Sequence, residues 1–121
     1  MKITKFEDLE IWKRSLSITK NVYDISTKRE FFRDFELKNQ IRRAVISISS
    51  NIVEGFEKNN NNEFVRFMKI AKGSIGEVRN QLYISKAIGY ISSEEFIKLN
   101  SSLIELGKKE KVKRKGFFKT H

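Results

Sequence analysis

The stretch that decides the fold is residues 62–82, NEFVRFMKIAKGSIGEVRNQL. In it and just beyond, apolar and small side chains recur at alternating steps of four and three residues, at Phe64, Met68, Ala71, Ile75, Val78, Leu82 and Ser85. This spacing is the seam of a coiled-coil-like helical bundle, and Phe67 widens it. We therefore expect a helix over about 61–88 that packs its seam against other helices.

Local signals define both ends of this helix. Asn60 and Glu63 have capping-box spacing at its start, and Gly89 is placed to end it. Gly73 and Gly76 lie inside the pattern, where glycine lowers helix stability. We interpret them as points where a neighbouring backbone approaches closely, in preference to a phosphate-binding glycine loop.

Three further helices are expected, over about 7–27, 34–54 and from a Ser92–Glu95 capping box to Gly107. Gly55 is placed to cap the second of these with a positive φ. The apolar stripe of the second helix is Leu37, Ile41, Ala44, Val45, Ile48 and Ile52, and that of the last is Phe96, Leu99, Leu103 and Leu106. Together the four segments predict an all-α protein with an antiparallel up-and-down four-helix bundle at residues 1–107 and a basic tail at 108–121.

The first helix carries two apolar stripes. We expect the first stripe to face the core, and it consists of Leu9, Trp12, Leu16, Thr19 and Tyr23. The second consists of Ile11, Ile18, Val22 and Ile25, and a separate apolar set, Ile70, Ile84 and Ile88, lies on the 61–88 helix. A small domain with apolar side chains on two helix faces usually has a second packing partner. We therefore expect Ile11, Ile18, Val22, Ile70 and Ile84 to form an interface between copies of the chain.

Between the first two helices lies the stretch KREFFRDF, residues 28–35. It holds three aromatic residues, Phe31, Phe32 and Phe35. Aromatic side chains are most often buried, so we expect all three to cover the end of the core.

A row of polar residues follows one side of the second helix, at Gln40, Arg43, Ser47, Ser50, Asn51 and Glu54. Short amide and hydroxyl side chains lose little entropy when ordered. We expect Arg43, Ser47, Asn51 and Glu54 to form a hydrogen-bonded interface between subunits. Direct contact with a ligand is the less favoured alternative.

The chain is strongly basic, with a net charge of +10. Seven basic residues against one glutamate lie between Gly107 and His121. A basic surface fits a phosphate backbone, because neutralised phosphates release counterions. The candidate nucleic-acid-binding residues are Lys38, Arg42, Arg43, Arg66, Lys69, Lys72, Arg79, Lys111, Lys113, Arg114 and Lys115. Ordinary solvated helix faces and a solubilising tail are the alternative.

Catalysis is disfavoured by composition. The chain has no cysteine and a single histidine at its last position, so thiol nucleophiles and imidazole bases are missing. Its acidic residues are not spaced to converge on a metal ion. We expect a single-domain, non-enzymatic protein that has no cofactor, does not enter membranes and is located in the cytoplasm.

Four blocks of the chain resemble a known family. They are FEDLEIWKRSLSITKNVY, QIRRAVISISSNIVEGF, NEFVRFMKIAKGSIGEVRNQL and AIGYISSEEF, within residues 6–106. They are similar to the four-helix bundle proteins encoded by intervening sequences in bacterial 23S rRNA genes. The most specific part is Arg42, Arg43, Ala44, Ser47, Asn51, Glu54 and Gly55, in that order.

The resemblance implies an up-and-down bundle that assembles as a ring-shaped homopentamer. A similar protein is the accessory factor of diversity-generating retroelements, which binds RNA and a reverse transcriptase. The first functional hypothesis is therefore an oligomeric scaffold that binds structured RNA through repeated basic helix surfaces. The second is an adaptor that docks a protein such as a reverse transcriptase and makes no direct contact with RNA.

Overall fold

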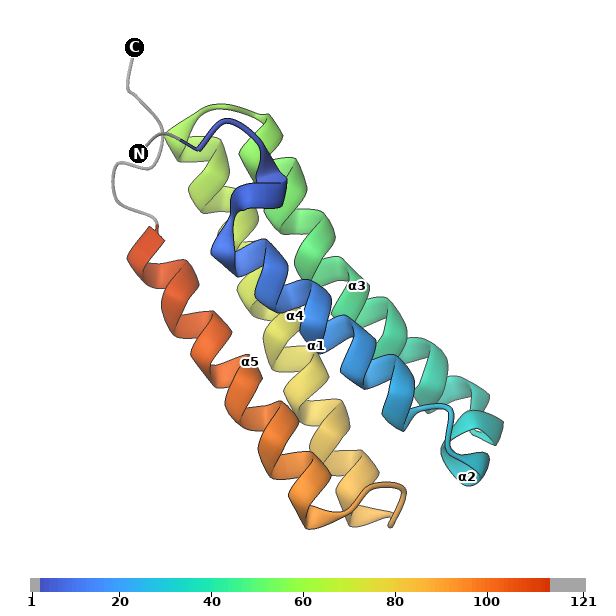
Figure 1. Ribbon diagram of the computed structural model, residues 1–121. Helices are drawn as coiled ribbons and strands as arrows, with labels where there is room; N and C mark the ends of the chain where they lie inside the picture. Colours follow the sequence, from blue (N-terminus) through green and yellow to red (C-terminus); the bar gives the residue numbers. More distant parts are fainter. Residues whose placement is uncertain (1–2, 114–121) are drawn as a thin grey trace.

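The computed structural model describes residues 3–113, with side chains described as far as residue 108. Over that range the regular elements are helical: a 3-10 helix η1 (Phe6–Asp8), α1 (Glu10–Ile25), α2 (Arg29–Arg33), α3 (Phe35–Glu57), α4 (Asn61–Ala87) and α5 (Ser93–Lys113). The four long helices lie side by side, and each runs opposite to the one before it (Figure 1). The predicted all-α, up-and-down bundle is confirmed.

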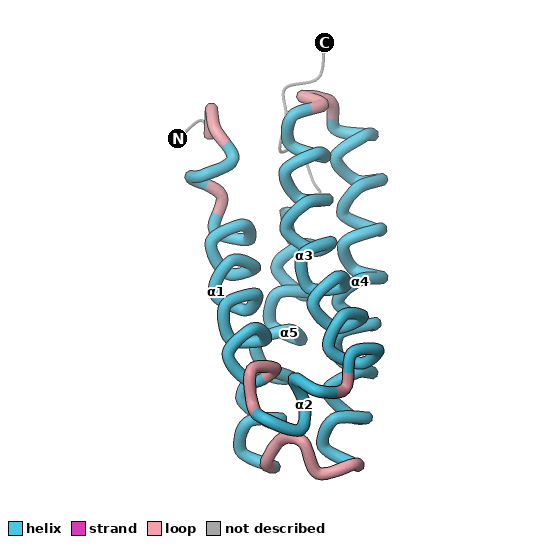
Figure 2. The backbone as a smooth tube through the Cα atoms, turned by 90° about the vertical axis from the view of Figure 1, so that its right-hand side faces the viewer, coloured by secondary structure: helices cyan, strands magenta, loops and turns pink. Residues whose placement is uncertain are grey.

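The four long helices enclose one core. Helix α3 packs on α1 and α4, and α5 packs on α4 and α1, so helices that are neighbours in sequence are neighbours in space. The short α2 closes the end of the bundle where α1 leads into α3 (Figure 2). None of the helices in residues 3–113 has a stretch that is both long and apolar enough to span a lipid bilayer.

Helix α4 agrees with its prediction along its whole length. All seven seam residues and Phe67 are buried. The Asn60 side chain accepts a hydrogen bond from the backbone N–H of Glu63 at 3.1 Å. At the other end Gly89 has φ +84°, and the N–H of Tyr90 donates to the carbonyl of Ser85 at 2.8 Å. These features are those of a Schellman motif, a helix C-terminus in which glycine adopts the left-handed conformation.

Helix α3 has the predicted core stripe but runs past its predicted end. Gly55 lies inside the helix, and the left-handed residue after it is Asn59, with φ 52°. A Cβ atom built on Gly55 would lie 2.8 Å from Cβ of Phe67 on α4. Gly73 and Gly76, in contrast, have nothing within 4 Å of a built Cβ. The close approach that we predicted for Gly73 and Gly76 therefore occurs at Gly55 instead.

The two stripes of α1 differ from their predicted roles, although Leu9, just before the helix, is buried in the core as predicted. Ile11, Ile18 and Val22 are buried in the core of their own chain, while Leu16 is 52% exposed. Trp12, Thr19 and Tyr23 are half-buried beside α3. The indole, hydroxyl and phenol groups suit this edge, where one end of each side chain meets water.

The α2 region also differs from its prediction. Phe31 is fully buried, but Phe32 is 45% and Phe35 65% exposed. Only the first of the three phenylalanines covers the core. The side chain of Asp34 caps α3 by accepting a hydrogen bond from the N–H of Leu37 at 3.1 Å.

Helix α5 begins at the predicted capping box. The hydroxyl of Ser92 accepts from the N–H of Glu95 at 3.1 Å, and a carboxylate oxygen of Glu95 accepts from the N–H of Ser92 at 2.9 Å. Its four predicted core residues are buried. The helix does not end at Gly107 but continues to Lys113. Glycine lowers helix stability without stopping a helix that packing holds in place.

Candidate nucleic-acid interface

A groove between α4 and α5 is lined by three basic residues, Lys72, Arg79 and Lys108. It has a volume of about 270 Å³ and is lined by Lys72, Ile75, Gly76, Arg79, Leu103, Ile104, Gly107 and Lys108. Gly76 and Gly107 have no side chain, and a built Cβ on either meets nothing within 4 Å. The α4–α5 groove therefore combines an apolar floor with a rim of basic residues.

Three lysines at or near this groove are exposed, namely Lys69, Lys72 and Lys108. Lys69 lies one helical turn from Lys72, so the two side chains share one side of α4. Within residues 3–108 none of the three takes part in an ion pair or side-chain hydrogen bond. Arg79 is half-buried, and its Nε donates to Oδ1 of Asn100 on α5 at 2.8 Å. The three lysines are therefore accessible to an anionic partner.

Lys108 was not among the predicted binding residues, although four other basic residues of the predicted tail were. The signal that could have placed it is the stretch after Gly107, which is rich in lysine and has no proline. Lysine is a good helix former, so the helix continues and brings Lys108 beside α4.

Arg66 is partly neutralised by its own helix. Its Nε and Nη2 donate to the two carboxylate oxygens of Glu63, each at 3.2 Å, and its guanidinium lies 4.5 Å from the ring centroid of Phe67. The hydrogen bond to Arg66 lowers the pKa of Glu63, and the same bond raises the pKa of Arg66, with a smaller contribution from Glu54 on α3. Arg66 is therefore a weaker candidate than Lys69 or Lys72.

Two of the predicted cations on α3 have structural contacts instead. Lys38 is only 8% exposed, and its Nζ lies 3.7 Å from the ring centroid of Phe32. The Nε of Arg42 donates to Oγ of the buried Ser26 at 2.8 Å, and the guanidinium stacks on Tyr23 at 4.3 Å. The prediction of Lys38 and Arg42 as nucleic-acid-binding residues is not supported by these contacts, because rings on α1 and α2 already hold both side chains.

The polar row on α3 is divided between two roles. Ser47 Oγ lies 2.8 Å from Ser74 Oγ on α4, and Nδ2 of Asn51 donates to the carbonyl and the hydroxyl of Ser47 at 2.8 and 3.0 Å. Ser47 and Asn51 therefore join α3 to α4 within one chain, so their prediction as subunit contacts is wrong. Arg43 and Glu54 are exposed, and their pairing between subunits stays a prediction.

The predicted apolar interface is corrected in the same way. Ile11, Ile18 and Val22 are no more than 3% exposed in the single chain, so a second copy cannot cover them. Ile70 and Ile84 are 43% and 41% exposed on α4 and remain available. The physical reason is that these two lie on the side of α4 opposite its seam.

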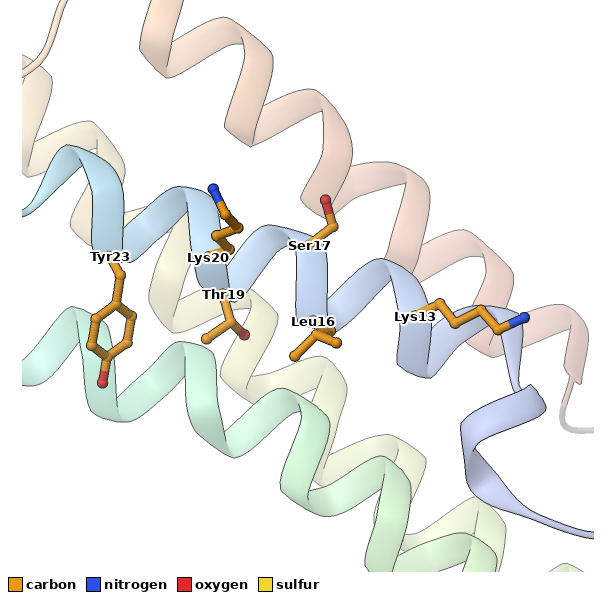
Figure 3. A pocket seen from close by; sticks show the side chains of 6 residues that line it. All are labelled: Lys13, Leu16, Ser17, Thr19, Lys20 and Tyr23. Atoms are coloured by element: carbon orange, nitrogen blue, oxygen red, sulfur yellow. The ribbon is translucent and has the colours of Figure 1, made fainter.

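Leu16, Thr19 and Tyr23, which were predicted to face the core, lie on a partly exposed face of α1. A hollow of about 540 Å³ is lined there by Lys13, Leu16, Ser17, Thr19, Lys20 and Tyr23. Figure 3 shows Leu16, Thr19 and Tyr23 on the side of α1 that is next to α3. If α1 contributes to an interface between copies, this face is the one that has apolar surface to bury.

The side chains of Lys111 and Lys113, and all of Arg114 and Lys115, lie outside the described residues. Among the residues that the structure does describe, no three His, Cys, Asp or Glu side chains cluster in a way that could hold a metal ion.

The fold and the basic surface define the class of protein as a basic helical bundle. Comparison with known proteins identifies the family. The sequence model of the 23S rRNA-intervening sequence proteins matches residues 7–111, and the chain belongs to that family. A solved structure from Bacteroides thetaiotaomicron, a protein of unknown function from the S23 ribosomal protein family, has the same fold. It is 22% identical, with a TM-score of 0.78, and the match covers 87% of this chain and 98% of that one. No curated protein matches.

Proposed function

We propose that this chain is a non-enzymatic scaffold that binds structured RNA, and that copies of it associate so that one basic surface is repeated. The observation that carries the proposal is the group of unpaired lysines at the α4–α5 groove: Lys69, Lys72 and Lys108. The family name, which refers to a segment of ribosomal RNA genes, is consistent with it.

Electrostatics supports the choice of RNA. The net charge is +10, and solvent-exposed lysines without acidic partners can be neutralised by phosphates at little desolvation cost. A shallow groove with basic sides suits a backbone that is recognised by charge and shape, since phosphate contacts position a nucleic acid without reading its bases.

Association of copies would multiply this surface. Exposed apolar side chains occur on two different faces, around Leu16 on α1 and at Ile70 and Ile84 on α4. Contacts between two different faces of the same chain generate rings when the rotation closes. The homopentamer implied by the resemblance is one such ring, and each added copy contributes another set of lysines.

The test is RNA binding as a function of salt. We expect a mobility shift with a structured RNA at low salt. A plot of the logarithm of the binding constant against the logarithm of the salt concentration should have a slope that is smaller in magnitude by about two in the Lys69→Gln, Lys72→Gln double variant. The matched control is Lys5→Gln with Lys98→Gln, which removes the same charge from exposed positions elsewhere. Absence of binding at low salt would exclude the proposal, and equal losses in both double variants would exclude the assigned surface.

The oligomeric part has its own test. Sedimentation equilibrium should give a mass that is a multiple of 14.3 kDa at micromolar concentration. Leu16→Arg should shift the mass toward the monomer without unfolding the chain, because that side chain is half exposed in the single copy. A wild-type species of 14.3 kDa would remove the repeated surface from the proposal.

The adaptor remains the second candidate, and one observation favours it. Ile97 and Ile104 are exposed on α5, and Ile104 lines the same groove, so an apolar partner segment could also dock there. A protein such as a reverse transcriptase would then bind with little salt dependence. Retained binding of that partner together with no RNA shift would favour the adaptor.

A further inference from the structure

The end of the bundle at α2 exposes two aromatic rings on a rigid support. Phe31 anchors α2 in the core, where its ring lies 5.3 Å from that of Tyr90. Phe32 and Phe35, on either side of the α2–α3 junction, are 45% and 65% exposed. Leaving two phenyl rings exposed to water is unfavourable in free energy. A role in covering the core does not explain their position, because Phe31 alone covers it.

Basic side chains alternate with these rings. Nζ of Lys38 lies 3.7 Å from the centroid of Phe32 and 4.7 Å from that of Phe35. The guanidinium of Arg42 lies 4.3 Å from the centroid of Tyr23 and 5.8 Å from that of Phe32. We call this set the aromatic ladder; in order it is Phe35, Lys38, Phe32, Arg42 and Tyr23. Cations held at this distance fix the orientation of aromatic rings.

The ladder is tied to three other parts of the fold. Arg42 is bonded to Ser26 at the end of α1. The carboxylate of Asp34, between Phe32 and Phe35, accepts a hydrogen bond at 3.0 Å from the hydroxyl of Tyr90, and this bond raises the pKa of Tyr90. Lys28 and Glu95 form an ion pair between the start of α2 and α5. The exposed rings are thus held in place before any ligand arrives, which reduces the entropy lost on binding.

The surroundings of the rings carry positive charge. Residues 28–42 contain five basic and three acidic residues. One of the three acids is already engaged, because the carboxylate of Asp34 caps α3 and accepts a hydrogen bond from Tyr90. The other two, Glu30 and Glu36, are exposed. Arg29 and Arg33 are exposed one turn apart on α2, and within residues 3–108 neither has an ion pair.

We infer that Phe32 and Phe35 form a stacking platform for unpaired bases of RNA, with Arg29 and Arg33 placed for the adjoining phosphates. Flat rings stack on any base, and neighbouring cations follow the backbone, which is how single strands are bound without sequence preference. An apolar protein segment fits less well, because it would have to cover the two exposed guanidinium groups of Arg29 and Arg33. The inference rests on the proposed RNA-binding function and adds which part of the RNA is held here.

The experiment compares a single strand of about 12 nucleotides with a duplex of the same length, because bases inside a duplex cannot reach the platform. Phe35→Leu keeps an apolar side chain but removes the ring. We expect it to weaken single-strand binding about tenfold, and Phe32→Leu with Phe35→Leu to weaken it further, while duplex binding is unchanged. A 2-aminopurine base in the single strand should change its fluorescence on binding to the wild type and not on binding to the double variant.

Two matched variants control for other causes. Phe35→Tyr keeps the ring and should retain wild-type affinity, and Ile97→Ala removes an equally exposed apolar side chain from α5 and should have no effect. Phe35→Leu is expected to fold normally, because Phe35 is mostly in solvent.

Each result decides between the two claims. Unchanged single-strand binding in both phenylalanine variants, with the wild type still binding duplex, overturns the platform and leaves the proposed function standing. Equal weakening on single strand and duplex also overturns the platform. A wild type that binds neither RNA overturns both the platform and the proposed function.

Discussion

Glycine has opposite roles on the two sides of α4, the side that packs on α3 and the side that faces outward. On the side toward α3, Gly55 lies so close to Phe67 that no Cβ fits between them, and Ser74 bonds Ser47 across the contact. On the outward side, Gly73 and Gly76 face open space. The side toward α3, the closed side, is therefore tightly packed, whereas the outward side leaves the helix backbone and the lysines accessible. A glycine in a helix therefore indicates close packing only when a second helix is known to approach it.

The largest expected effect follows from filling the closed side. Gly55→Ala should lower the free energy of unfolding by about 1 to 2 kcal/mol, because the new methyl group meets Cβ of Phe67, which is fixed to the α4 backbone and cannot rotate away. Urea denaturation monitored by circular dichroism measures the change.

The outward glycines are the matched controls for that substitution. Gly73→Ala and Gly76→Ala should each raise the free energy of unfolding by up to about 1 kcal/mol, since they gain helix propensity and meet no neighbour. Destabilisation by these two changes, or stabilisation by Gly55→Ala, would show that the contrast between the two sides is wrong.

A smaller effect is expected from the hydroxyl pair on the closed side. Ser47→Ala leaves the buried hydroxyl of Ser74 without its partner and should cost about 1 kcal/mol, and Ser74→Ala should cost a similar amount. The double variant should be more stable than the sum of the two losses predicts, because no unpaired hydroxyl remains. Additive losses in a double-mutant cycle would mean that the two hydroxyls do not interact.

The smallest effect is expected at the rim, where Glu95 pairs with Lys28. The hydrogen bond from Lys28 is the main cause of the lowered pKa of Glu95. A lowered pKa in the folded state contributes stability above the ordinary value of 4.5, and this contribution is lost as the pH falls through the folded pKa. Because both side chains are partly in solvent, the contribution is a few tenths of a kcal/mol, about what exposed ion pairs give.

Glu95→Gln isolates this charge, since glutamine can still accept the hydrogen bond of the capping box. The variant should be slightly less stable than the wild type near neutral pH, and the difference should shrink as the pH falls below 4.5 and vanish below the lowered folded pKa of Glu95. Thermal unfolding across that range measures it, with Glu94→Gln as the control because Glu94 forms no ion pair within residues 3–108. A constant difference at every pH would assign the effect to the cap and not to the charge.

Most of the bundle was predictable, because its evidence is local. The α4 seam and both of its ends, the reciprocal hydrogen bonds of Ser92 and Glu95, and the α5 core stripe follow from spacing within a few residues of chain. The predicted cations Lys69 and Lys72 are exposed and unpaired within the described residues for the same reason, as they lie away from an unambiguous seam.

Predictions failed where one helix offers two apolar faces or where partners come from distant residues. Helix α1 could bury either stripe, and only its position between α3 and α5 selects Ile11 and Ile18. Lys38 and Arg42 were predicted as nucleic-acid-binding residues, and their aromatic partners come from other helices, Phe32 on α2 and Tyr23 on α1. The exposed rings of Phe32 and Phe35 were missed because their type is usually buried.

The four long helices, the core stripes of α3, α4 and α5, and the caps at Asn60, Gly89 and Ser92 were thus predictable from side-chain periodicity and from hydrogen bonds between residues close in sequence. The packed bundle was needed to settle which face of α1 is inside, which glycine is close to a neighbour, and which basic side chains remain free. Each of these depends on which side chains of another helix lie against the residue, because those neighbours determine whether it is buried or paired. Residue spacing within a single segment carries no information about it.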